Sequence, residues 1–216
     1  MKNLKKILSC ISHDQSDYYQ KSLDEWKSHN DACINNAFDN EECKIGRLLA
    51  KYPNIRSYAF DIGAGAGWLT SKLSENFEYV IAIEPSAKAI EICKTMYPQQ
   101  NIIWMCGFAE DILPKIEFDQ TNPIFINTCS VFIHMSDEYV TPILDIINSS
   151  RVCKGSILSF QEFWSPLLHY NEPMGNCRSI QWWTNKLCNW KLNFHGIEVF
   201  NQGSNIFKGL HGEKIQ

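Results

Sequence analysis

Short apolar runs alternate with helical patterns along the middle of the chain. Five segments are apolar enough to form buried strands: 57–61, 79–83, 101–105, 123–127 and 156–160. Between the second and third runs, Ser86 can cap a helix whose Ile90, Cys93 and Tyr97 share one face. Continuously apolar strands that alternate with helices predict an α/β fold, a doubly wound and mostly parallel sheet covered on both faces.

A further helix is expected between the fourth and fifth runs. Thr141 precedes Pro142, and proline suits the first position of a helix, so the helix is predicted to start there. Its Ile143, Ile146 and Ile147 would face the sheet.

The pattern changes after residue 160. A loop rich in aromatic and turn-forming residues is predicted for 161–177, followed by a helix that carries Trp182 and Trp183, both more typical of a core than of a ligand platform. Two strand-like segments, 191–200 and 204–210, flank Gln202-Gly203. That pair favours a turn, so the segments predict an antiparallel hairpin that closes the sheet edge.

The first fifty residues read as polar and helical. Tyr18, Tyr19, Leu23 and Trp26 recur at helical spacing, and a second helix is expected over 41–51. At roughly 150 residues per domain, 216 residues make about 1.4 domains. We therefore expect an N-terminal helical cap, 1–56, on one α/β domain, 57–216.

Composition and charge narrow the function. Hydrophobic residues make up 44% of the chain, which is too apolar for disorder. The net charge is −4 and the four arginines are scattered, so the cationic stripe of a nucleic-acid-binding protein is missing. Nine cysteines without a CxxC pair favour reduced thiols in or near the core, among them Cys93, Cys106, Cys129 and Cys153. With no apolar run of about 18 residues, we expect a cytoplasmic protein without a membrane helix.

A glycine-rich segment carries the chemistry. Asp61-Ile62-Gly63-Ala64-Gly65-Ala66-Gly67 lies where the first strand hands over to the first helix. Glycines there let the backbone turn tightly and approach a ligand. A dinucleotide fingerprint would need its third glycine at Trp68, which makes a dehydrogenase a weak alternative.

Two further segments follow at the next strand ends. Glu84 stands 23 residues after Asp61, before Pro85, and can accept both hydroxyls of a ribose. Cys106-Gly107-Phe108-Ala109-Glu110-Asp111 follows the third strand, where an adenine could lie.

With these three features in order, residues 57–211 resemble a class I S-adenosylmethionine-dependent methyltransferase of the small-molecule type. The resemblance implies the family's seven-stranded sheet with its last strand antiparallel. It implies S-adenosylmethionine as cofactor, with S-adenosylhomocysteine as product. It also implies a cofactor site made of Asp61, Gly63, Ala64, Gly65, Gly67, Glu84, Pro85, Phe108, Ala109, Glu110, Asn127 and Tyr19. One departure is Phe108, because the family often has an acid there.

The acceptor side follows the fourth strand, in Asn127-Thr-Cys-Ser-Val-Phe-Ile-His-Met135. His134 is a candidate general base, because its unperturbed pKa of about 6.5 suits proton removal near neutrality; the plainer interpretation is a histidine that orders the loop. Glu162, just past the fifth strand, is a second catalytic candidate, or it binds acceptor or caps a helix. His169 and Tyr170 could line the acceptor, or belong to a surface loop.

The sequence therefore predicts methyl transfer to a small polar acceptor, with oxygen the favoured atom and a sugar or related metabolite as one guess. The Asn/Asp-Pro-Pro-aromatic motif of amino methyltransferases is missing, and the strand ends in Asn127-Thr128 without acids, so no metal is expected. A non-catalytic S-adenosylmethionine-binding module and a protein or RNA methyltransferase stay open as alternatives. The sequence leaves the oligomeric state undetermined.

Overall fold

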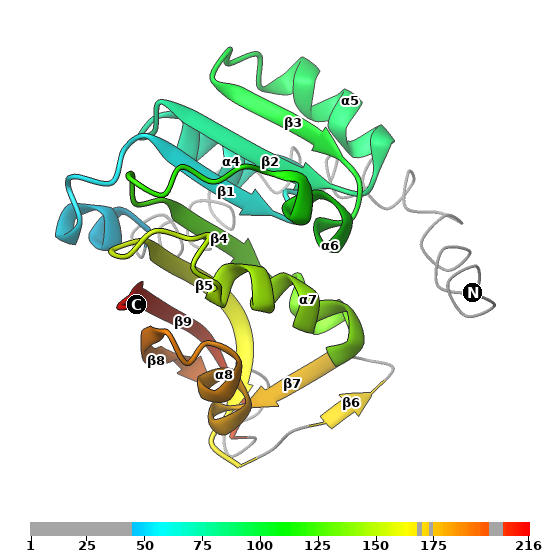
Figure 1. The fold of residues 1–216 in the computed structure, drawn as a ribbon. Helices are drawn as coiled ribbons and strands as arrows, with labels where there is room; N and C mark the ends of the chain where they lie inside the picture. Colours follow the sequence, from blue (N-terminus) through cyan, green and yellow to red (C-terminus); the bar gives the residue numbers. More distant parts are fainter. Residues whose placement is uncertain (1–44, 168–169, 173–174, 199–204) are drawn as a thin grey trace.

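The structure is a computed structural model that describes residues 45–167, 170–172, 175–198 and 205–216 (Figure 1). Five parallel strands form the centre of the sheet in the order β3-β2-β1-β4-β5. They are β1 (Tyr58–Ile62), β2 (Tyr79–Glu84), β3 (Ile102–Cys106), β4 (Phe125–Cys129) and β5 (Ile157–Ser165). All five correspond to the predicted apolar runs, although β4 begins and ends two residues later than expected.

The C-terminal hairpin extends this sheet beyond β5. β8 (Trp190–Glu198) and β9 (Phe207–Lys214) pair antiparallel, and β9 also pairs antiparallel with β5. The order is therefore β3-β2-β1-β4-β5-β9-β8, with the last strand inserted antiparallel between two strands that run the other way. The predicted fold class, a doubly wound and mostly parallel methyltransferase sheet, is confirmed.

The prediction of a loop over 161–177 is wrong. β5 continues to Ser165, and two short strands follow, β6 (Tyr170–Glu172) and β7 (Gly175–Ser179). These two pair antiparallel, and β7 also runs parallel to the last residues of β5. Turn residues interrupt the apolar positions of this segment, a pattern that favours a loop. Its strands form instead by pairing, β7 with β5 and β6 with β7, rather than through an apolar face of their own.

Helices cover both faces of the sheet. They are α4 (Trp68–Ser74), α5 (Ala87–Met96), α6 (Ala109–Ile112), α7 (Asp137–Asn148) and α8 (Ile180–Lys186), with short 3₁₀ turns η1 (Leu113–Lys115) and η2 (Phe132–His134). Ser86 caps α5 as predicted, since its hydroxyl accepts the Ala89 N–H.

The predicted start of α7 at Thr141 is wrong. The helix begins at Asp137 after Ser136, and Pro142 lies inside it. Two acids occupy the first turn, where they interact favourably with the helix dipole. The earlier start leaves the predicted apolar face unchanged, and its Ile143 and Ile147 are fully buried.

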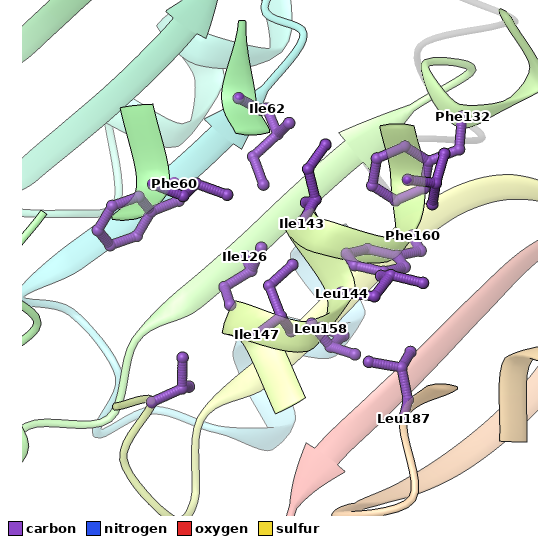
Figure 2. Packing of buried hydrophobic residues seen from close by; sticks show 14 of the residues in the cluster. Phe60, Ile62, Ile126, Phe132, Ile143, Leu144, Ile147, Leu158, Phe160 and Leu187 are labelled. Carbon is purple, nitrogen blue, oxygen red and sulfur yellow. The ribbon is translucent and has the colours of Figure 1, made fainter. Parts of the chain in front are cut away.

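Alternate residues of the central strands point to two separate cores. Phe60, Ile126 and Leu158 pack with α7 and α8 on one face (Figure 2). Their neighbours Ala59, Phe125 and Ile157 pack on the opposite face, against α4 and residues 45–55. A strand directs successive side chains to opposite faces, so the continuous apolar runs record burial on both sides. Trp183, with no exposed surface, belongs to the first core as expected.

The N-terminal segment is described only from residue 45. Residues 45–51 are helical, at the end of the second predicted helix, and Ile45 and Leu49 pack in the core on the α4 face. Tyr18, Tyr19 and the rest of the proposed cap lie outside the described residues, so the division at residue 56 stays a prediction.

The six cysteines of the described part are free thiols. Cys93 is buried as expected, and Cys129 and Cys153 are partly buried. Cys106, predicted in or near the core, is exposed because it ends β3, which is the edge strand of the sheet.

Candidate active site

The glycine-rich loop turns sharply between β1 and α4. Gly63, Gly65 and Gly67 have φ angles of 71°, 53° and 77°, a region that favours glycine. The backbone N–H groups of Gly63 and Ala64 donate to the Ile83 carbonyl at 2.8 and 3.1 Å, which holds the loop against the end of β2. A Cβ on Gly65 would meet nothing within 4 Å, so the loop leaves open space on that side.

Asp61 ties three elements together beneath the loop. It is 2% exposed, and its two oxygens accept hydrogen bonds from the Thr70 hydroxyl on α4 and from the Asn127 amide on β4, the latter at 2.8 Å. Burial raises the pKa of this carboxyl, and the two hydrogen bonds oppose that shift. The oxygen of the same Asn127 amide is buried and has no hydrogen-bond partner among the described residues.

Glu84 lies beside the loop, as its place in the sequence predicts. It is 3% exposed, and its oxygens accept the N–H groups of Gly65 at 2.9 Å and of Ser86 at 3.0 Å. The carboxylate therefore fixes both the glycine-rich loop and the start of α5. Pro85, next to it, is exposed.

The segment after β3 lies next to Glu84 and is the third part of the candidate site. The Gly107 N–H donates to the Glu84 carbonyl at 3.1 Å, and half-buried Phe108 precedes α6. In the first turn of α6, the Oε2 atom of Glu110 is buried without a hydrogen-bond partner in the described part of the chain. Burial is the main cause that raises the pKa of this carboxyl.

A second loop follows β4 and carries His134. We call residues 130–135 the acceptor loop. It opens at Ser130, whose φ of 56° is unusual for a residue other than glycine. The Glu162 carboxylate accepts the N–H groups of Val131 at 2.9 Å and Phe132 at 3.0 Å. Glu162 is fully buried, and desolvation raises its pKa against these hydrogen bonds.

The carbonyl groups of the acceptor loop are held from β7. The Arg178 guanidinium, 1% exposed, donates to the carbonyls of Phe132 at 2.7 Å and Met135 at 2.6 Å, and to Asp137 at 2.8 Å. Asn176, two residues earlier on the strand, donates to the Ile133 carbonyl at 2.8 Å. Buried side chains from β5 and β7 thus fix the loop from both sides.

The two loops are in contact. A Cβ on Gly63 would come within 2.3 Å of a methyl group of Val131, so the acceptor loop packs directly on the glycine-rich loop. His134, at the end of η2, is exposed, and partial desolvation of its ring lowers its pKa. A lowered pKa favours the neutral imidazole, which can accept a proton.

Several predicted residues do not enter this geometry. Tyr19 and His169 lie outside the described residues, and the structure describes the backbone of Tyr170 in β6 but not its side chain. No group of three or more His, Cys, Asp or Glu side chains in the described ranges could hold a metal ion. Within the same ranges, no helix is long and apolar enough to cross a membrane.

Sequence reasoning missed the residues that hold the loops. Thr70, Asn176 and Arg178 all use polar side chains to fix distant backbone or side-chain groups. The spacing of Asn176 and Arg178, two residues apart, was a usable signal, because it places both on one face of a strand.

Comparison with known proteins identifies the domain. Residues 60–141 match the family model of a methyltransferase domain, and this range holds both loops and Glu84. The chain therefore contains a class I S-adenosylmethionine-dependent methyltransferase domain. The predicted family and enzyme class are therefore confirmed. None of the curated protein sequences matches the chain significantly.

Several solved structures share the fold at low sequence identity. A complex of DhpI with SAH is 18% identical, has a TM-score of 0.62, and aligns over 94% of this chain and 96% of its own. A DhpI complex with SAM and HEP is 16% identical, with a TM-score of 0.61 over 92% and 94%. A putative methyltransferase in complex with the Haloferax volcanii Trm112 activator is 10% identical, with a TM-score of 0.63 over 94% and 98%. At these identities the likeness concerns the fold.

Proposed function

We propose that this methyltransferase transfers the methyl group to an oxygen of a small polar acceptor, without a metal ion. The observation that carries the proposal is the meeting of the glycine-rich loop and the acceptor loop at Gly63 and Val131. It brings the ends of β1 and β4 together, so that a cofactor held on one side lies beside an acceptor held on the other.

The described residues fit the cofactor. Each Glu84 oxygen accepts a backbone N–H, and because a carboxylate oxygen can accept more than one hydrogen bond, the group suits the two ribose hydroxyls. The buried oxygens of Glu110 and Asn127 lack donors, and the adenine amino and methionine ammonium groups could supply them. We assign the open side of Gly65 to the methionine part and the flank of Phe108 and Ala109 to adenine. Asp61, Gly67, Ala64 and Pro85 complete the proposed site.

Two of the similar solved structures support the same cofactor. DhpI has been solved with SAH, and also with SAM and HEP. Bound S-adenosylmethionine supplies a methyl group that is activated by its sulfonium. The chain then has to orient the acceptor oxygen, keep water out and remove a proton.

The two catalytic candidates receive different roles in this proposal. Glu162 is fully buried and has both oxygens occupied by the acceptor loop, so we assign it a positioning role rather than the predicted catalytic one. His134 is exposed on the same loop, and its lowered pKa favours the neutral imidazole, so it is the proposed general base.

Calorimetric titration with S-adenosylhomocysteine tests the cofactor site. Glu84→Gln should weaken binding tenfold or more, because one hydrogen bond to a charged group is worth about 1.5 kcal/mol or more. Glu91→Gln, on the exposed side of α5, should leave the affinity unchanged. Equal affinities of the two variants would refute the ribose role of Glu84.

Release of S-adenosylhomocysteine across a panel of hydroxyl compounds tests the reaction. His134→Asn should lower kcat by about a hundredfold or more if the histidine is the base. The wild-type rate should decrease when the pH is lowered through the depressed pKa of His134, because the imidazole then becomes protonated. Cofactor binding without turnover of any compound would favour the non-catalytic alternative, and retention of RNA at low salt would favour an RNA substrate.

A further inference from the structure

A lysine from the last strand lies at the acceptor side of the site. β9 runs antiparallel to β5, so its first residues lie at the carboxyl end of β5. Lys208 is half-buried there, and its ammonium nitrogen is 3.8 Å from the Cys129 sulfur at the end of β4. Residues almost eighty positions apart thus meet beside the acceptor loop.

The Lys208 ammonium has N–H groups that donate to no described residue. It carries three N–H groups, and the one hydrogen bond it makes there goes to a thiol, which is a weak acceptor. Its charge lowers the pKa of Glu162, but both oxygens of that carboxylate are bound to the acceptor loop. The buried Arg178 guanidinium, by contrast, donates to Asp137 and two carbonyls, and buried Lys214 donates to the Asn148 carbonyl.

A buried acceptor lies next to the same thiol. Gln161 is the register partner of Cys129 in the sheet and is 2% exposed. Its side-chain oxygen has no hydrogen-bond partner in the described part of the chain. A buried polar atom without a partner is costly, and a ligand hydroxyl would relieve that cost.

The charges at the carboxyl edge of the sheet are divided. Asp61, Glu84 and Glu110 lie at the ends of β1, β2 and β3, beside the proposed cofactor, which carries a sulfonium and an ammonium. Lys208 lies at the end of β5, on the acceptor side, where the one carboxylate it acts on, Glu162, is buried and bound to the acceptor loop. An anionic acceptor complements both the cofactor and this lysine.

We propose that the methyl acceptor is a small hydroxylated anion, whose carboxylate or phosphate group binds Lys208 and whose hydroxyl donates to Gln161. This inference rests on the proposed function and narrows its acceptor class. Lys208 and Gln161 are then residues that determine specificity.

Matched pairs of acceptors test the proposal. Release of S-adenosylhomocysteine is measured with glycolate against ethylene glycol, and with glycerol 3-phosphate against glycerol. We expect kcat/KM at least tenfold higher for the anionic member of one pair. Which pair shows the preference separates a carboxylate from a phosphate site. Equal or faster turnover of the neutral members would overturn the proposal.

Variants locate the preference. Lys208→Gln should lower kcat/KM for the anionic acceptor at least tenfold and change that for its neutral counterpart less than threefold, whereas Lys208→Arg should keep most of the preference. The control Lys191→Gln, on exposed β8 surface, should behave as wild type. An unchanged preference in Lys208→Gln would overturn the role of the lysine.

A binding measurement decides the case if no compound is turned over. The protein loaded with S-adenosylhomocysteine is titrated with inorganic phosphate and with glycolate. Saturable binding that Lys208→Gln weakens tenfold supports the anion site, and failure of the wild type to bind either probe refutes it. Loss of S-adenosylhomocysteine binding itself would instead count against the proposed function.

Discussion

Single residues decide how closely the two loops approach each other. Gly63 and Gly65 share the same backbone region, but only Gly63 faces Val131, while Gly65 faces open space. The same substitution therefore has two different consequences at positions two residues apart.

Alanine variants at both glycines separate packing from cofactor binding. Each should cost about 1–2 kcal/mol through its left-handed backbone. Gly63→Ala should cost roughly 1–3 kcal/mol more, because its Cβ strikes Val131. Gly65→Ala should instead weaken S-adenosylhomocysteine binding. Urea unfolding and calorimetry measure the two effects, and Gly65→Ala with unchanged affinity would show that the cofactor does not use that space.

At the scale of elements, β7 is a support for the acceptor loop. Its Arg178 and Asn176 donate to three carbonyls of the acceptor loop, while Glu162 on β5 accepts two N–H groups of the same loop. A loop held on both sides keeps its geometry without help from a ligand.

Arg178→Met should destabilise the protein strongly. Removing one partner of a buried ion pair costs about 3–5 kcal/mol, and we expect the lower end because the Asp137 side chain is 31% exposed. Lys94→Met, on the exposed side of α5, should change the free energy of unfolding by less than about 0.5 kcal/mol. Urea unfolding of both variants measures this difference. Equal free energies of unfolding would contradict the conclusion that β7 supports the acceptor loop.

At the scale of the whole molecule, the C-terminal hairpin joins the first described helix. The His211 ring on β9 lies tilted against the His195 ring on β8, with ring centroids 4.9 Å apart. Burial, together with the charges of His195 and of Lys51 from the N-terminal helix, lowers the pKa of His211 to about 4. Three distant segments therefore set the charge state of one ring.

This arrangement makes stability depend on pH in a known direction. Between pH 6.5 and about 4 the unfolded chain binds a proton at His211 that the native protein does not. The contribution of His211 to the free energy of unfolding is therefore fully present above pH 6.5 and is lost as the pH falls through that window. When the pH is lowered from 7 to 5, the free energy of unfolding of His211→Asn should thus rise relative to that of the wild type. Parallel stability curves for the two proteins would contradict this.

Much of the fold could be predicted from local sequence. The five central strands are buried on both faces, so their apolar runs stand out, and Ser86 caps α5 through a residue three positions away. The start of α7 was misplaced because Pro142 suits a first turn but does not require one. β6 and β7 were missed because cross-strand pairing, which has no local signature, holds them.

The sequence by itself determined the order of the elements, the glycine-rich loop and the place of Glu84, since each depends on residues close together in the chain. Only the tertiary structure decided that Glu162 binds the acceptor loop, that Arg178 holds its carbonyls and that Lys208 reaches Cys129. These contacts join residues from 31 to 79 positions apart. Such contacts depend on strand order and register, which follow from packing the entire sheet and not from any one segment.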